Sequence, residues 1–199
     1  MTEIYIVRHG QTDSNVRSTY LGHTDIELNS CGIRQAEKLA EKLSGVKFDA
    51  LYTSPLLRAV QTAEQIAKGQ NGLFMTMNYG LIERDYGDWD NLTYDEILSQ
   101  NPSECQKWLE NWIEYQVPNG ESARQVHERV SQTMDKIIAQ NPDSKILIVS
   151  HLGVIRHMIA YLLDMKIQDA WKFTADNCSV STVQINDGKT LITGLNNKL

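Results

Sequence analysis

Two histidines each stand two residues after a short apolar run. His9 follows residues 4–7 (Ile-Tyr-Ile-Val), and His151 follows residues 146–149 (Ile-Leu-Ile-Val). Runs of β-branched and aromatic residues of this length predict buried strands. In open α/β sheets, ligands bind beyond the carboxyl ends of the strands. We therefore expect the two imidazoles to meet at one site.

Two arginines are expected at the same edge of the sheet. Arg8 precedes His9, and Arg58 follows a third candidate strand at residues 49–53. Guanidinium groups are planar, permanent cations that bind phosphate oxygens in pairs. Neutral imidazole is a nucleophile near pH 7, and phosphorus accepts attack by it. The combination predicts phosphoryl transfer in which arginines stabilise the charge. The chain has no P-loop motif and no acidic triplet suited to Mg²⁺, so we expect neither a metal nor a cofactor.

Segments that resemble helices and strands alternate along the chain. Apolar residues recur at intervals of three and four in stretches that predict helices over residues 32–43, 56–67, 123–138 and 154–163. Further strands are expected over residues 73–77, 179–185 and 191–194. Such alternation predicts an α/β fold, a three-layer sandwich in which helices flank a mostly parallel central sheet.

Residues 85–119 form a helical insertion between sheet elements. A capping-box pattern begins at Thr93 and predicts a short helix that ends near Gln100. Pro102 suits the first turn of a second helix. No linker, repeat or low-complexity tract interrupts the chain, so we predict one domain over residues 1–199 that includes this insertion.

Aromatic residues mark the insertion. Trp108 and Trp112 are four residues apart, which predicts that they share a helical face that packs against a neighbour. The alternative is a substrate lid formed by that face together with Trp89 or Tyr86, because aromatic rims suit an organic leaving group. His23, in a loop after the first motif, is a further candidate for the mouth of the pocket.

The composition and net charge limit the kinds of molecule that the protein is expected to bind. Of the 199 residues, 41% are hydrophobic and 22% are charged, which suits a folded core, and the formal net charge is −6. Nucleic acids and anionic membranes both attract a basic surface, so neither is expected as a partner. No apolar run approaches the ~20 residues of a membrane span, and the N-terminus lacks a signal-peptide pattern. The three cysteines lie far apart, which predicts reduced thiols and a cytoplasmic protein.

The same residues carry a resemblance to a known family. Arg8-His9-Gly10-Gln11-Thr12, followed by Asn15, resembles the signature of the histidine phosphatase superfamily, in its phosphoglycerate-mutase-like branch. Similar blocks follow in the family's order at residues 21–28 with Gly32, 54–63, 83–89, 118–122 and 149–156. A lone Arg-His-Gly occurs by chance, whereas ordered blocks along most of the chain are specific. The resemblance implies a phosphoglycerate-mutase-like fold.

The resemblance also implies roles for individual positions. His9 is implied to be the nucleophile that becomes phosphorylated. Glu83 is implied to be the general acid that protonates the leaving oxygen, and then the base that activates water. Arg8, Arg58 and His151 are implied to form the phosphate pocket. Further contacts to phosphate or substrate are implied at Gln11, Thr12, Asn15, Leu21, Gly22 and Leu152.

One position departs from the family pattern. Many phosphatase members carry Gly-Gly after the second histidine, where this chain has Leu152-Gly153. The backbone N–H of Leu152 can still face the phosphate. Its side chain is expected to reshape the wall of the pocket.

The expected reaction is hydrolysis of a small phosphate monoester through a phosphohistidine on His9. Phosphoglycerate mutases of this family resemble the chain but are longer, with extra segments that cover the site, so the length favours hydrolysis. Among phosphatases, the resemblance is to the α-ribazole phosphatase and broad-specificity groups, and α-ribazole 5′-phosphate is the first candidate substrate. A phosphoglycerate mutase and a non-catalytic phospho-ligand-binding module stay open as alternatives. A homodimer stays open as well.

Overall fold

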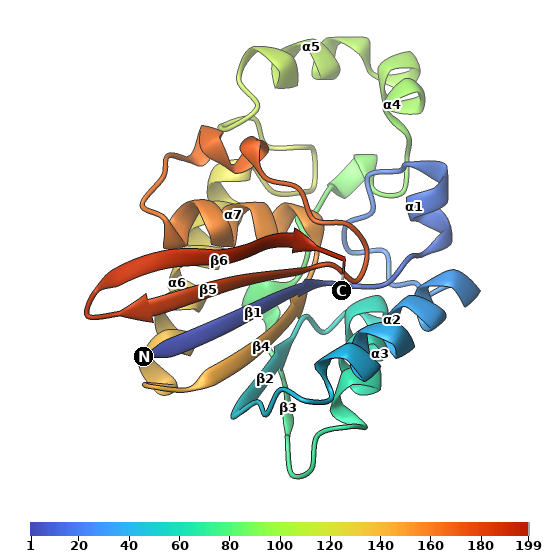
Figure 1. The fold of residues 1–199 in the computed structure, drawn as a ribbon. Coiled ribbons are helices and arrows are strands. Elements are labelled where there is room, and N and C mark those ends of the chain that lie inside the picture. The colour runs from blue at the N-terminus through green and yellow to red at the C-terminus, as the bar shows by residue number, and fades with distance from the viewer. Residues whose placement is uncertain (199) are drawn as a thin grey trace.

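A mixed sheet of six strands forms the centre of the molecule (Figure 1). The computed structural model describes residues 1–198. The strands are β1 (Thr2–Arg8), β2 (Ala50–Thr53), β3 (Met75–Met77), β4 (Lys145–Ser150), β5 (Val180–Asn186) and β6 (Lys189–Asn197). Their order in the sheet is β3-β2-β4-β1-β5-β6. The first four strands run parallel to one another, and β5 runs antiparallel to both of its neighbours, which confirms the predicted mostly parallel sheet.

Helices cover both faces of the sheet. They are α1 (Asp13–Arg17), α2 (Ser30–Leu43), α3 (Leu57–Ala67), α4 (Tyr94–Gln100), α5 (Pro102–Glu110), α6 (Ala123–Gln140) and α7 (Leu152–Leu162). Three short 3₁₀ helices join them: η1 (Tyr79–Leu81), η2 (Gly87–Trp89) and η3 (Ile167–Lys172). Figure 1 shows α2 and α3 on one face and α6 and α7 on the other. The predicted α/β sandwich is confirmed.

Side-chain alternation along the buried strands divides the core into two layers. In β1, Ile4 and Ile6 join the apolar cluster under α6 and α7, whereas Val7 joins the cluster under α2 and α3. In β4, Ile148 and Val149 divide in the same way. Successive side chains of a strand point to opposite faces, so a strand covered on both faces is apolar throughout.

The boundaries of several elements differ from the sequence-based expectation. Helix α7 begins at Leu152 and not at residue 154, and β3 begins at Met75 and not at residue 73. Helix α1 was not expected, because five residues are too few to show a helical period. The sequence feature that marks this helix is local, because Thr12 caps it and forms a capping box with Asn15.

The insertion contains the two short helices that the sequence predicts. Helices α4 and α5 lie beyond the end of the sheet (Figure 1), above a small apolar cluster that includes Trp89 and Val117. The expectation that Trp112 continues the second helix is wrong. Helix α5 ends at Glu110 because Asn111 leaves helical geometry (φ −150°, ψ 63°), and the Trp112 ring packs edge-on against Trp171 instead.

The division of the chain into domains stays a prediction. The single domain was expected to run to Leu199, which lies outside the described residues. Within residues 1–198, the insertion packs through Tyr86 and Trp108 against Tyr20, which precedes it in the chain.

Candidate active site

Strands β1 and β4 bring the two histidines together. The strands pair in parallel with Arg8 opposite Ser150, so His9 and His151 each come one residue after this pair. The ring centroids lie 5.0 Å apart. The His9 N–H donates to the Ser150 carbonyl at 3.0 Å, which extends the ladder to the site. The register of two buried strands therefore sets the spacing of the imidazoles.

Hydrogen bonding determines the tautomer of His9. Its Nδ1 lies 2.7 Å from the Gly10 carbonyl oxygen, which can only accept, so Nδ1 carries the proton. Burial, with the positive charges of Arg58 and Arg8, lowers the pKa of His9 well below its usual range. The ring is therefore neutral, and Nε2 holds a lone pair. This is the form of imidazole that attacks phosphorus.

The second imidazole is held by two side chains. His151 accepts a bond at Nδ1 from Arg58 Nε at 3.3 Å, and its Nε2 lies 2.7 Å from the Ser54 hydroxyl oxygen. These contacts place the proton of the neutral ring on Nε2, which donates to Ser54. Burial, followed by the charge of Arg58, lowers the pKa of His151 well below its usual range. Two neutral rings thus lie side by side among arginines.

Arg58 is fully buried in the first turn of α3. Its Nη1 donates to the Thr24 carbonyl at 3.0 Å and its Nη2 to the Gly22 carbonyl at 2.7 Å. With the bond to His151, these contacts use three of its five N–H groups. Burial lowers the pKa of Arg58 to about 10, so the group remains a cation at neutral pH. Two donors are left for an anion beside the imidazoles.

Arg8 has a donor with no partner. Its Nη1 donates to the Ala175 carbonyl at 2.8 Å. Its Nε is buried and lacks a hydrogen-bond partner among residues 1–198. A buried N–H that stays unpaired costs free energy, and bound phosphate oxygens would remove that cost. Arg8 is therefore arranged for an anionic ligand.

Glu83 lies in the loop after η1 and borders the same cavity as Arg8 and His9. Its side chain is 6% exposed, and its two oxygens accept from the backbone N–H of Arg84 at 2.8 Å and of Gly153 at 3.1 Å. A Cβ at Gly153 would lie 2.6 Å from Glu83 Oε1, so a side chain there would displace the carboxylate from its present position. The departure from the family pattern falls at Leu152, one residue before this glycine, and Leu152 belongs to the wall of the cavity.

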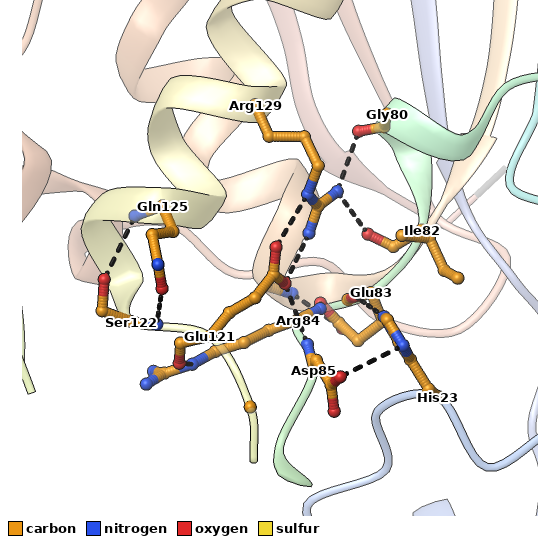
Figure 2. A network of polar contacts seen from close by, with 12 residues as sticks. His23, Gly80, Ile82, Glu83, Arg84, Asp85, Glu121, Ser122, Gln125 and Arg129 are labelled. Atoms are coloured by element: carbon orange, nitrogen blue, oxygen red, sulfur yellow. Dashed lines mark hydrogen bonds and ion pairs between the residues drawn. The ribbon is translucent and has the colours of Figure 1, made fainter. Parts of the chain in front are cut away.

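A polar network supports the loop that carries Glu83 (Figure 2). Arg129, on α6, binds the Glu121 carboxylate through Nε and Nη2 and donates from Nη1 to the carbonyls of Gly80 and Ile82. Glu121 Oε2 accepts from the backbone N–H of Asp85 at 3.0 Å. The carboxylate and the guanidinium thereby hold the chain on both sides of Glu83.

His23 belongs to this network and does not line the cavity. Its Nε2 donates to the Glu83 carbonyl at 3.0 Å, and its Nδ1 lies 3.5 Å from Asp85 Oδ2. The alternative that His23 lines the mouth of the pocket is therefore wrong. The ring links the loop after the first motif to the Glu83 loop instead.

Arg8, His9 and Glu83 line a cavity of about 280 Å³. Its lining consists of Arg8, His9, Asn15, Thr19, Tyr20, Leu21, Glu83, Tyr86, Leu152, Gly153, Arg156 and Trp171. Asn15, Leu21 and Leu152 were expected near the substrate and lie in this wall. Arg58 and His151 were also expected to form the phosphate pocket, but both are fully buried and do not line this cavity. They contact each other, and the His151 ring lies against His9.

Three further expected contacts lie outside the lining and support the loops. Gln11 Oε1 accepts from Asn29, and Thr12 caps α1. The Gly22 carbonyl accepts from Arg58, and the Gly22 N–H donates to Asp90 Oδ1. These residues hold the chain that surrounds the phosphate pocket.

Thr19, Tyr20, Arg156 and Trp171 also lie in the cavity wall, and the sequence predicted no role for any of them. Leu152 and Arg156 are four residues apart on α7, so they share a helix face. This spacing could have predicted from the sequence that Arg156 lies in the same wall as Leu152. Trp171 lies on the 3₁₀ helix η3, whose short length gives no period to detect.

Within residues 1–198, no group of three or more His, Cys, Asp or Glu side chains is arranged to hold a metal ion. None of the helices in the same residues combines the length and the apolar character needed to cross a bilayer.

Comparison with known proteins points to one family. The family model described as the histidine phosphatase superfamily (branch 1) matches residues 4–198. Phosphoserine phosphatase 1 of Hydrogenobacter thermophilus is 30% identical over 196 residues, which cover 98% of this chain and 92% of the relative. The adenosylcobalamin/alpha-ribazole phosphatase of Escherichia coli is 30% identical over 195 residues, or 98% of this chain and 96% of the relative.

Solved structures agree with the sequence comparisons. The crystal structure of the alpha-ribazole phosphatase from Shigella flexneri matches with a TM-score of 0.93 at 29% identity, over 98% of this chain and 96% of the other. The matches extend over nearly the whole length of both chains. The chain belongs to branch 1 of the histidine phosphatase superfamily, and it is a phosphomonoesterase.

Proposed function

We propose that His9 and Glu83 hydrolyse a small phosphate monoester in two steps. The observation that carries this proposal is the neutral His9 ring, whose unprotonated Nε2 lies in a cavity that also contains the Glu83 carboxyl group. A nucleophile that forms a covalent intermediate divides a difficult displacement into two easier ones.

In the first step, His9 Nε2 attacks phosphorus and the ester P–O bond breaks. Glu83, in its protonated form, gives its proton to the departing alkoxide. The imidazole becomes positively charged, and the Gly10 carbonyl, which accepts from Nδ1, stabilises that charge. Arg8, Arg58 and His151 hold the phosphoryl oxygens during transfer.

In the second step, water attacks the phosphohistidine. Glu83 takes a proton from the water as the new P–O bond forms and the P–N bond breaks. Inorganic phosphate leaves, His9 returns to its neutral tautomer, and Glu83 is protonated again. Each turnover thus consumes one ester and one water and releases one alcohol and one phosphate.

The proposal extends to the residues that contact the substrate, the identity of the substrate, the cellular compartment and the oligomeric state. Asn15, Leu21 and Leu152 line the cavity and would contact the ester. Gln11, Thr12 and Gly22 would act by supporting the surrounding loops. α-Ribazole 5′-phosphate is a candidate substrate, because relatives named for it align over nearly the whole chain. All three cysteines are free thiols, which favours the cytoplasm as the compartment. A homodimer stays a prediction.

The first experiment traps the covalent intermediate. Rapid mixing with p-nitrophenyl phosphate, followed by an alkaline quench, should reveal an acid-labile phosphohistidine in the wild type. His9→Ala should form none and lose turnover by roughly 10⁴-fold or more, with a melting temperature measured to exclude unfolding. Full activity of His9→Ala would refute the mechanism. Conversion of 3-phosphoglycerate to its isomer after priming with 2,3-bisphosphoglycerate would instead favour the mutase alternative.

A further inference from the structure

Arg156 occupies a wall of the cavity and is held in a single orientation. It projects from α7, and its Nε donates to the Phe173 carbonyl at 2.8 Å. The centre of the guanidinium lies 4.5 Å from the centroid of the Trp171 ring. A hydrogen bond at one edge and an aromatic ring against one face fix the plane of the group.

The outer edge of this guanidinium is free. Neither Nη1 nor Nη2 has a hydrogen-bond acceptor among residues 1–198, and the side chain borders the same cavity as His9 and Glu83. A fixed guanidinium fork with parallel N–H groups matches the two oxygens of a carboxylate. The geometry is thus that of a preformed receptor for a second anionic group.

We propose that Arg156 binds a carboxylate on the leaving group, so that the preferred substrates are phosphate monoesters of small hydroxy or amino acids. This inference rests on the proposed function, because it places the phosphoryl group at His9. The cavity of about 280 Å³ lies just below the volumes typical of pockets for drug-sized ligands. The carboxylate must therefore lie only a few bonds from the phosphate.

The test compares substrates that differ only at the carboxylate. O-Phosphoserine is paired with O-phosphoethanolamine, and 3-phosphoglycerate with glycerol 3-phosphate. The wild type should hydrolyse the acid of each pair with a kcat/KM at least ~10-fold higher than its partner, the range expected for hydrogen bonds to a charged group. The ratio within a pair cancels any change in the phosphoryl step itself.

Variants of Arg156 should remove this preference. Arg156→Gln should lower the ratio by ~10- to 100-fold, and Arg156→Lys, which keeps the charge but lacks the fork, should retain part of it. Arg34→Gln is the matched control, because Arg34 is an exposed arginine on α2 and should keep the wild-type ratio. Melting temperatures show whether each variant folds, and the wild-type ratio tests the proposal without any variant.

Several outcomes would overturn the inference and leave the phosphatase in place. These are a wild-type ratio near one, an equal loss for both esters in Arg156→Gln, and turnover of α-ribazole 5′-phosphate ~10-fold above that of phosphoserine. In each case p-nitrophenyl phosphate would still be hydrolysed and phosphohistidine would still form. Loss of both of those signals in the wild type would overturn the proposed function together with the inference.

Discussion

The two ends of the cavity are built differently. The phosphate end is lined by Arg8, His9 and Glu83 and backed by the buried Arg58 and His151. The aromatic end is lined by Tyr20, Tyr86, Arg156 and Trp171, and Trp112 packs against Trp171. At the phosphate end, His9, Arg58, Glu83 and His151 are at most 6% exposed, whereas Trp171 is 51% exposed.

The difference lies in what holds each side chain. At the phosphate end, backbone carbonyls and N–H groups bind the functional groups directly, and the sheet register sets their spacing. At the aromatic end, ring contacts such as Tyr20 against Tyr86 and Trp112 against Trp171 hold the wall. Hydrogen bonds have stricter geometry than ring contacts, so we expect changes at the first end to alter kcat and changes at the second to alter KM.

The largest effect in this comparison is expected for Glu83→Gln. The amide can keep the size of the side chain but can neither give a proton to the leaving group nor take one from water. Turnover of an alkyl phosphate should fall by ~10²-fold or more while inorganic phosphate still binds. Steady-state kinetics and phosphate inhibition measure the two quantities. Unchanged turnover would remove Glu83 from the mechanism.

A smaller loss is expected when the support of Glu83 is weakened. Glu121→Gln removes the charge that binds Arg129 and weakens the acceptor for the Asp85 N–H, so the Glu83 loop should shift. We expect kcat to fall by roughly 10-fold with little change in KM, because small displacements of catalytic groups are costly.

Glu114→Gln is the matched control for that variant. Glu114 also pairs with an arginine of α6, Arg124, but the pair is exposed and lies away from Glu83. Its loss should leave kcat unchanged, since exposed ion pairs contribute little. If both variants lose activity equally, the effect reports general destabilisation and the positioning role of Glu121 is refuted.

The smallest effect concerns the aromatic end. Trp112→Ala removes the ring that packs 5.6 Å from Trp171 and so loosens the wall beside the leaving group. KM for an aryl phosphate should rise by roughly 2- to 10-fold with kcat nearly constant, the range expected from loss of one aromatic pair.

Trp108→Ala provides the contrast, because Trp108 packs against the buried Trp89 inside the insertion. It should lower the melting temperature and leave KM unchanged. If Trp112→Ala also changes only the melting temperature, the aromatic residues pack the insertion and the lid hypothesis fails.

The phosphate end was largely predictable from the sequence. Apolar runs that end in Arg8-His9 and Ser150-His151 predict strands with charged groups at their carboxyl ends, and the α/β alternation predicts which edge they share. The structure brings these groups together as that topology requires. Glu83 differs, because no periodic pattern surrounds it and only the family resemblance pointed to it.

The aromatic end was much less predictable. Spacing of four residues suggested one helical face for Trp108 and Trp112, yet the helix ends between them and the two rings pack against different partners. Trp171 and Arg156 come from η3 and α7, far along the chain, and only folding puts them beside the insertion.

The sequence by itself determined the order of strands and helices, the residue types at the strand ends and hence the class of chemistry. These properties depend on local patterns of apolar and polar residues, which a single chain displays directly. The tertiary structure alone decided the tautomers of the two histidines, the network that holds Glu83 and the free edge of Arg156. Each of these depends on contacts between segments that are distant in sequence, whose geometry no local pattern encodes.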